Sequence, residues 1–107
     1  MPTVNEGIAL KFLGDVPEDK VFYSHDGRIL KNVSDLSIAL GEMSDETFAY
    51  HSNTEKTDFS NWVKDVIGDE KLASDIQKSG SRLRAAKAVF DRIAFLRTKI
   101  PASRRQR

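Results

Sequence analysis

The strongest pattern in the chain is a stripe of apolar residues at helical spacing between residues 58 and 76. From Phe59 onward, apolar side chains recur at i, i+3, i+4, i+7 and i+8, which places them on one face of a helix. Gly68 interrupts this stripe and Asp69 restarts it. We therefore predict one helix capped by Asp58 and a second capped by Asp69, because an aspartate at the N-cap accepts a hydrogen bond from a first-turn amide.

Three further segments have helical patterning. A helix capped by Ser34 is predicted to run to about Met43, and Ser44 is predicted to cap a short helical turn that contains Phe48. The last helix is predicted from about Ser81 to Ile100. It ends before Pro101 because the residue preceding a proline disfavours helical dihedral angles.

The first thirty residues favour β structure. Ile8, Leu10 and Phe12 alternate with other residues, which predicts a short strand, and Asp26-Gly27 separates two β-prone runs and predicts a tight hairpin turn. A lone hairpin is marginal in water, so it must pack on the helices. We expect an α+β, predominantly helical fold, with the hairpin on four or five short helices. We expect residues 1–100 to form one compact domain, in which 1–19 are the candidates for partial flexibility, and 101–107 to form a flexible basic tail.

The apolar stripes also predict the core. Trp62 lies in the middle of the strongest stripe, which favours a core anchor over a platform for stacking on a nucleic-acid base. The expected core residues are Phe22, Leu36, Leu40, Phe48, Phe59, Trp62, Val63, Val66, Leu72, Ile76, Phe90 and Ile93.

Composition excludes several classes of protein. The 107 residues contain no cysteine, which excludes disulfides, thiolate metal sites and cysteine nucleophiles. No apolar run approaches the length of a membrane span, and the N-terminus lacks a secretory pattern, so we expect a cytoplasmic protein that does not associate with membranes. Nucleotide-binding glycine loops and the Gly-x-Ser-x-Gly nucleophile motif are absent. A non-enzymatic binding module without a cofactor is therefore favoured over an enzyme.

Charge is distributed unevenly along the chain. The net charge is +1, yet residues 1–79 contain 8 Lys/Arg and 15 Asp/Glu, whereas residues 80–107 contain 9 Lys/Arg and only one acid, Asp91. Two explanations remain open. Either the basic segment lies on the acidic body, or it serves an anionic partner.

The last helix carries the candidate site. One broad face holds Leu83, Ala86, Val89, Phe90, Ile93, Ala94 and Ile100, and Arg97 lies within this apolar sector, where it must extend to solvent or pair with an acid between Asp65 and Asp75. Phe95 lies nearly opposite, among basic residues, which suits contact with a base or a polyanion but equally a second packing surface. The candidate polyanion-binding residues are Arg84, Arg92, Phe95, Lys99, Arg104, Arg105 and Arg107.

The two histidines and nearby acids give an alternative site. His51 with Asp58 and His25 would be the centre of a small metal-dependent enzyme, but their spacing matches no ligand motif. The favoured interpretation of His51 is structural, at a helix C-terminus where an imidazole donates to a free carbonyl. Asp65, Asp69, Glu70 and Asp75 are expected to form a solvated acidic face or the counterpart of the basic helix.

Through a set of residues that includes Asp58-Phe59-x-x-Trp62-Val63, about half the chain resembles a family of small bacterial and archaeal domains of unknown function. The core of the resemblance is Asp58-Phe59-x-x-Trp62-Val63 followed by Gly68-Asp69 and Leu72-Ala73. It also rests on Phe22, Asp26-Gly27-Arg28, Leu36, Leu40, Met43, Asp45-Glu46-Thr47-Phe48 and Tyr50-His51. Thr57 and Ser52 depart from the family pattern, which has Asn and Val at these positions. The resemblance implies a shared fold and carries no activity.

Three functions follow as hypotheses. The first is a binding module that engages nucleic acid or another polyanion through the basic C-terminal helix and tail. The second is a protein-interaction adaptor, or a self-associating module, that pairs its acidic body with the basic helix. The third is the small enzyme around His51 and Asp58.

Overall fold

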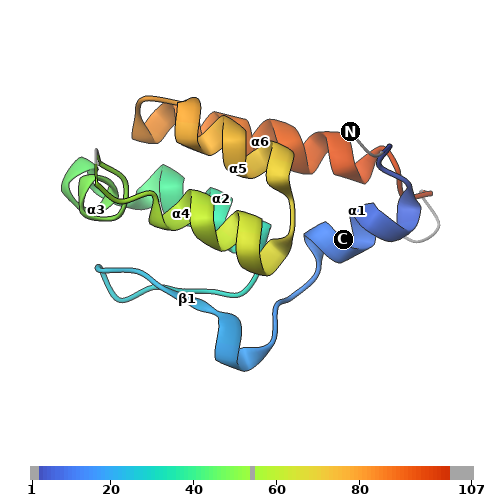
Figure 1. Ribbon diagram of the computed structural model, residues 1–107, viewed down its shortest axis with the longest axis horizontal. Coiled ribbons are helices and arrows are strands. Elements are labelled where there is room, and N and C mark those ends of the chain that lie inside the picture. The colour runs from blue at the N-terminus through green and yellow to red at the C-terminus, as the bar shows by residue number, and fades with distance from the viewer. Residues whose placement is uncertain (1–2, 54, 102–107) are drawn as a thin grey trace.

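The computed structural model describes residues 3–53 and 55–101, which form a layered helical body with a short hairpin on one side (Figure 1). The elements are α1 (Glu6–Leu13), the 3-10 turn η1 (Glu18–Lys20), β1 (Phe22–Tyr23), β2 (Ile29–Leu30), α2 (Val33–Glu42), α3 (Asp45–His51), α4 (Asp58–Trp62), the π-helical turn η2 (Val63–Ile67), α5 (Glu70–Lys78) and α6 (Arg82–Arg97). The predicted α+β, predominantly helical fold is confirmed. Within these residues, no helix combines the length and the apolar character needed to cross a bilayer.

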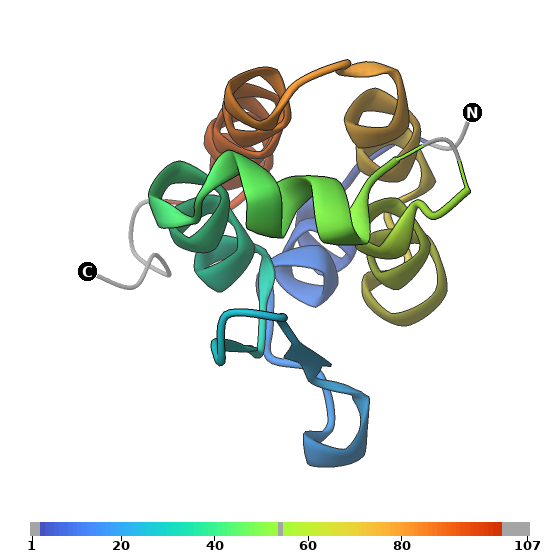
Figure 2. The same ribbon diagram turned by 90° about the vertical axis from the view of Figure 1, so that its left-hand side faces the viewer.

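The helices α2, α4, α5 and α6 run along the long axis of the molecule, and α6 packs chiefly on α2 and α5 (Figure 1). An end-on view shows the hairpin below the helices (Figure 2). Helix α1 packs on the C-terminal half of α6, where Ala9, Leu96 and Ile100 form a small apolar cluster beside the main core. The two ends of the described chain therefore meet.

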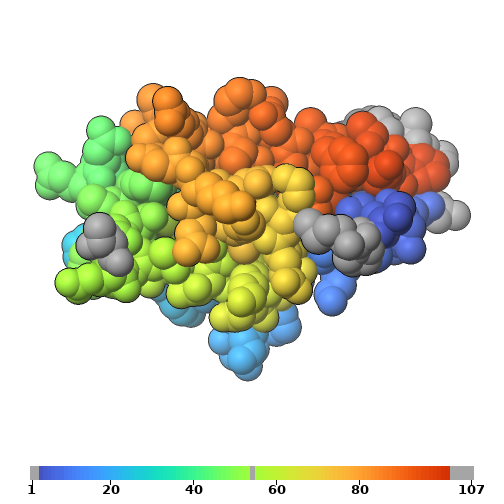
Figure 3. All heavy atoms as spheres, turned by 45° about the horizontal axis from the view of Figure 1, so that its top comes forward, coloured from blue at the N-terminus to red at the C-terminus, as the bar shows by residue number. Residues whose placement is uncertain are grey.

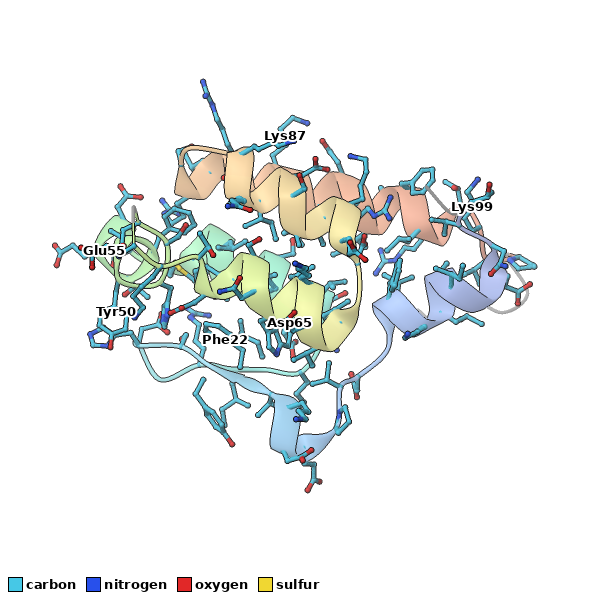
Figure 4. All side chains as sticks on the ribbon, in the orientation of Figure 1. Phe22, Tyr50, Glu55, Asp65, Lys87 and Lys99 are labelled. Carbon is cyan, nitrogen blue, oxygen red and sulfur yellow. The ribbon has the colours of Figure 1, made fainter. Side chains whose placement is uncertain are left out.

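Most of the predicted core is confirmed. The buried members are Leu36, Leu40, Phe59, Trp62, Val63, Leu72, Ile76 and Ile93, and Phe22, Phe48 and Val66 pack against them at the edge. Trp62 is a buried anchor, as predicted, and its indole N–H donates to the carbonyl of Lys20 at 2.8 Å. Phe22 reaches from the hairpin toward α4 (Figure 4), and its ring stacks on Phe59 at 5.0 Å between centroids. This aromatic cluster is one of the contacts that attach the hairpin to the helices, and the buried side chain of Leu30 is another.

The predicted strand at residues 8–12 is wrong, because this segment is helix α1. The side chain of Asn5 caps the helix by accepting the amide of Ile8 at 2.9 Å. Ala9, Phe12 and Leu13 then fall at i, i+3 and i+4 and turn inward, while Leu10 is exposed. The short segment fits both a two-residue and a helical period, and packing on α6 selects the helix.

The predicted inward face of the last helix is also wrong in part. Phe90, expected in the core, is 65% exposed, and Leu83 and Arg97 are exposed too. The buried face consists of Ala85, Val89, Ile93 and Leu96. Apolar residues occupy more than one side of this helix, so its rotation depends on where α2 and α5 lie, and Arg97 falls outside the core. The helix also ends earlier than expected, at Arg97.

Several details of the element ends differ from prediction. Asn32 rather than Ser34 caps α2, and Asp58 is the first residue of α4, where it makes no cap. Ser44 and Asp69 do cap α3 and α5, as predicted. The Asp26-Gly27 turn is present, with Gly27 at a φ of +92° that favours glycine, although each strand spans only two residues.

The break at Gly68 determines where Asp69 lies. The Gly68 amide donates to the carbonyl of Val63, five residues earlier, at 2.8 Å, which gives η2 its π-helical form. Gly68 itself adopts a φ of +93°, and α5 begins two residues later. This turn places Asp69 beneath α6, at the base of the site described next.

Candidate functional site

A hollow of about 600 Å³ lies between α1, the start of α5 and the C-terminal half of α6. Figure 3 shows the face on which these three segments come together. The apolar part of its lining consists of Val4, Ile8, Phe12 and Phe95. The cationic part consists of Lys11, Lys71, Arg92 and Lys99. A recess of this size is typical of small-ligand sites, which combine apolar walls with a few polar groups.

An ion pair between Asp69 and Arg92 forms the base of this hollow. Arg92 Nε donates to Asp69 Oδ2 at 2.8 Å, and Arg92 Nη2 donates to Asp69 Oδ1 at 3.0 Å. Asp69 is 1% exposed, and the Arg92 side chain is 11% exposed. Of the two expectations for Asp69, the solvated face is therefore wrong, and the counterpart of the basic helix is confirmed by its pairing with Arg92 of α6. A carboxylate this deeply buried requires a fork-shaped partner, and arginine provides one.

The same ion pair limits what Arg92 can offer to a ligand. Its positive charge is already neutralised by Asp69, so it is not a free contact for phosphate. A guanidinium carries five N–H donors, and only two of them meet an acceptor within the described residues. No described buried side-chain atom lacks a hydrogen-bond partner, so Nη1 of Arg92, which has no partner among the described residues, has access to solvent. Arg92 thus presents oriented donors at the hollow.

Phe95 lies at the wall of the hollow and is 41% exposed. The Arg92 guanidinium carbon lies 5.2 Å from its ring centroid, and the Lys99 ammonium lies 5.0 Å from it. Lys99 lies in the turn two residues after the end of α6, close to α1 (Figure 4). The structure therefore brings together three of the predicted polyanion-binding residues, although Arg92 is engaged by Asp69.

Of the other predicted residues, only Arg84 lies within the described part of the chain. Arg84 is exposed about two turns before Arg92 on α6 and does not line the hollow. Arg104, Arg105 and Arg107 lie outside the described residues. Lys11 and Phe12 were not among the predicted site residues, because residues 8–12 were predicted to form a strand. The signal that would have found them is Asn5, a preferred helix cap three residues before Ile8.

The first explanation of the uneven charge, that the basic segment lies on the acidic body, applies to two of its arginines. Arg82 pairs with Asp45 at 2.8 Å and donates to the Leu40 carbonyl at 2.9 Å, and Arg92 pairs with Asp69, so part of the basic helix lies on the acidic body. Arg84, Arg97 and Lys99 make no ion pair within residues 3–53 and 55–101, and Lys99 is the one of these that borders the hollow.

His51 is a structural residue at the C-terminal end of α3, as predicted, but its hydrogen-bond partners differ from the expected helix carbonyl. His51 is 5% exposed, its Nδ1 lies 2.9 Å from Asp58 Oδ2, and its Nε2 accepts the backbone N–H of His25 at 2.9 Å. A backbone amide donates only to an unprotonated nitrogen, which assigns the proton to Nδ1 and a neutral ring. His51 therefore does not donate to a helix carbonyl, and both its nitrogens are occupied. Among the described residues, no three His, Asp or Glu side chains converge to hold a metal ion.

The imidazole of His25 points elsewhere. It stacks on the ring of Tyr50 at 4.0 Å between centroids, and the ammonium of Lys56 lies 4.2 Å from the same Tyr50 ring. The Nζ atom of Lys56 also lies 3.5 Å from Oδ2 of Asp58. These contacts join the hairpin turn to the end of α3 and the start of α4. They account for the position of both histidines without a ligand.

No family model, curated protein or solved structure matches this chain. The resemblance to the family of small bacterial and archaeal domains therefore stays a prediction.

Proposed function

We propose that the protein is a non-enzymatic binding module that engages nucleic acid through the hollow and the adjoining C-terminal half of α6. The observation that carries this proposal is the half-exposed ring of Phe95, which lies between Arg92 and Lys99 at the wall of a hollow that also holds Lys11. An exposed aromatic ring among cations is the arrangement by which proteins stack on bases while they contact phosphates.

The cations available for phosphates are those without an internal acid. Lys11 and Lys99 at the hollow have no ion pair within the described chain, whereas Lys71 pairs with Asp75 at 2.7 Å. The tail adds Arg104, Arg105 and Arg107 by sequence. With 16 acids in the chain, long-range repulsion keeps the affinity modest, and we expect micromolar or weaker binding at physiological salt.

A salt titration of single-stranded and duplex DNA binding tests this proposal. About four to six phosphate contacts give a slope of log K against log salt near −3 to −4 on a single strand. Deleting residues 101–107 removes three arginines and flattens this slope by about 2. Lys99→Gln and Lys11→Gln each flatten it by about 0.7. Lys64→Gln is the matched control, since Lys64 is exposed and lies outside the hollow.

Binding that is absent at low salt would contradict the proposal. So would a slope that is the same in the Lys99→Gln, Lys11→Gln and Lys64→Gln variants, because the contacts would then lie elsewhere on the surface.

One observation favours the adaptor or self-association hypothesis as a second candidate. Phe90 and Ile38 are exposed on either side of a shallow groove of about 240 Å³ between α2 and α6, on the edge of α6 away from the hollow. Exposed apolar patches mark interaction surfaces in many proteins. The molar mass in solution tests this candidate. A dimer that Phe90→Ser converts to a monomer supports it, and a monomer at high concentration contradicts self-association.

A further inference from the structure

We infer that the hollow is a pocket for one unstacked base, so that the protein selects single-stranded nucleic acid and also binds a lone nucleoside monophosphate. This inference rests on the proposed function and adds the class of ligand and the residues that hold each of its parts.

The base is assigned to the hollow by size and chemistry. Helix α1 contributes Ile8 and Phe12 to its lining, and α6 contributes Phe95. A volume of about 600 Å³ is within the range of pockets that enclose small ligands, roughly 300–1,000 Å³. A base has two flat apolar faces, which suit these side chains, and stacking on an aromatic ring is favourable for every base.

The polar edge of the base meets Arg92. The pairing with Asp69 fixes the guanidinium through two hydrogen bonds and leaves three N–H donors without an acceptor in the described chain. Each base carries carbonyl or ring-nitrogen acceptors on its edge, to which an oriented guanidinium donates. Because Asp69 cancels the charge, Arg92 serves the base edge better than it serves a phosphate.

The phosphate is assigned to Lys11 and Lys99. A Cβ added at Gly68 would lie 3.8 Å from the Lys11 ammonium, so this lysine reaches across the hollow toward the start of α5. The Lys99 ammonium lies 5.0 Å from the centroid of the Phe95 ring, at the end of a long side chain. When a base takes its place on the ring, the Lys99 ammonium turns to the adjoining phosphate. The two lysines thus flank the base.

This arrangement discriminates against duplex. In a duplex the bases are stacked and paired, and a recessed ring does not reach them unless a base is extruded from the stack. The contacts that duplex retains are those to phosphate, so its affinity for the protein is lower than that of a single strand of equal length.

The test compares ligands that differ only in their bases, with the full chain. A thymidine octanucleotide, an octamer of the same length made wholly of abasic sites, and a duplex of equal length are titrated against the protein. We expect the abasic octamer to bind about 5- to 150-fold more weakly than the base-bearing strand, which is the effect of losing one stacked base. We expect the duplex to bind more weakly as well. Adenosine 5′-monophosphate should shift the backbone amide signals of α1 and of the second half of α6.

Substitution of the ring gives the matched comparison. Phe95→Leu should weaken the binding of the base-bearing octamer and leave that of the abasic octamer unchanged. Phe90→Leu is the control, because Phe90 is an exposed phenylalanine on the same helix but on the opposite edge. Both side chains are exposed, so both variants should fold, which their circular dichroism and melting temperatures would verify.

The outcomes separate the inference from the proposed function. Equal binding of abasic and base-bearing octamers, equal binding of duplex and single strand, or equal effects of Phe95→Leu and Phe90→Leu would each overturn base insertion and leave charge-driven binding standing. Failure of every octamer and of the duplex to bind at low salt would overturn both. Amide shifts confined to other helices would place the nucleotide site outside the hollow.

Discussion

Replacing Asp69 by alanine should unfold the protein at much lower denaturant than the natural chain requires. Asp69 is 1% exposed and accepts three hydrogen bonds, two from Arg92 and one from the Leu72 amide in the first turn of α5. The substitution leaves the Arg92 guanidinium without its counter-charge in a site where the arginine side chain is 11% exposed. It also removes the cap of α5.

The expected loss of stability follows from the broken ion pair and the lost helix cap. Removing one partner of a buried ion pair destabilises a protein by about 3–5 kcal/mol, and loss of an N-cap by about 1 kcal/mol. Arg92 borders the hollow and regains part of its hydration there, so we expect a total of about 3–5 kcal/mol rather than the full sum. With about 4 °C per kcal/mol for a chain of this size, the melting temperature falls by roughly 12–20 °C.

Urea unfolding followed by the fluorescence of the buried Trp62 measures this effect. Asp69→Asn separates the two losses, because the amide oxygen still accepts the Leu72 amide while the charge is gone. The double variant Asp69→Asn with Arg92→Leu should lose less stability than the sum of the losses in the two single variants, because it leaves no unpaired charge at this site. Asp65→Ala is the control, an exposed acid without an ion pair in the described chain, and should stay within about 0.5 kcal/mol.

A loss of less than about 1 kcal/mol in Asp69→Ala would refute this reasoning. It would mean that Arg92 relocates to solvent without penalty and that the pair does not determine how α5 and α6 pack.

Substitutions at three further positions have defined outcomes. Trp62→Ala should destabilise the protein by about 3–5 kcal/mol in thermal unfolding. Trp62→Phe should destabilise it by clearly less, because the phenyl ring retains most of the packing, although the hydrogen bond to the Lys20 carbonyl is lost. Equal losses of stability in the two variants would contradict this. His51→Phe should speed hydrogen exchange of the His25 amide, whose acceptor it removes, and unchanged protection would argue against that bond. The pKa of Asp26 is lowered from 3.8, first by the Ser24 hydroxyl and then by Arg28, so its carboxylate stabilises the fold above about pH 4 and this stability is lost as the pH falls through the lower folded value. Asp26→Asn should therefore lose less stability than the natural chain between pH 5 and 2, and parallel losses would contradict the shift.

Local signals were sufficient for part of this fold. The stripe from Phe59 to Ile76 predicted α4 and α5, because a helical period of apolar residues specifies both the helix and its buried face when only one such face exists. The caps at Ser44 and Asp69 and the turn at Gly27 were also predicted, since each depends on hydrogen bonds or dihedral angles within four residues. Trp62 was correctly placed in the core because it lies in the middle of the apolar stripe.

Where a segment supports two patterns, only the tertiary structure decides between them. Residues 8–12 suit a strand or a helix, and burial of Ala9 against Leu96 selects the helix. The last helix has apolar residues on several sides, and its contacts with α2 and α5 bury Val89 and expose Phe90. The site itself depends on such choices. Asp69 and Arg92 are 23 residues apart, and Lys11 is farther still, so no local pattern records that they meet. Periodicity determines that a helix forms, whereas the rotation of that helix, and so the residues that face a ligand, is determined by the surfaces against which it packs.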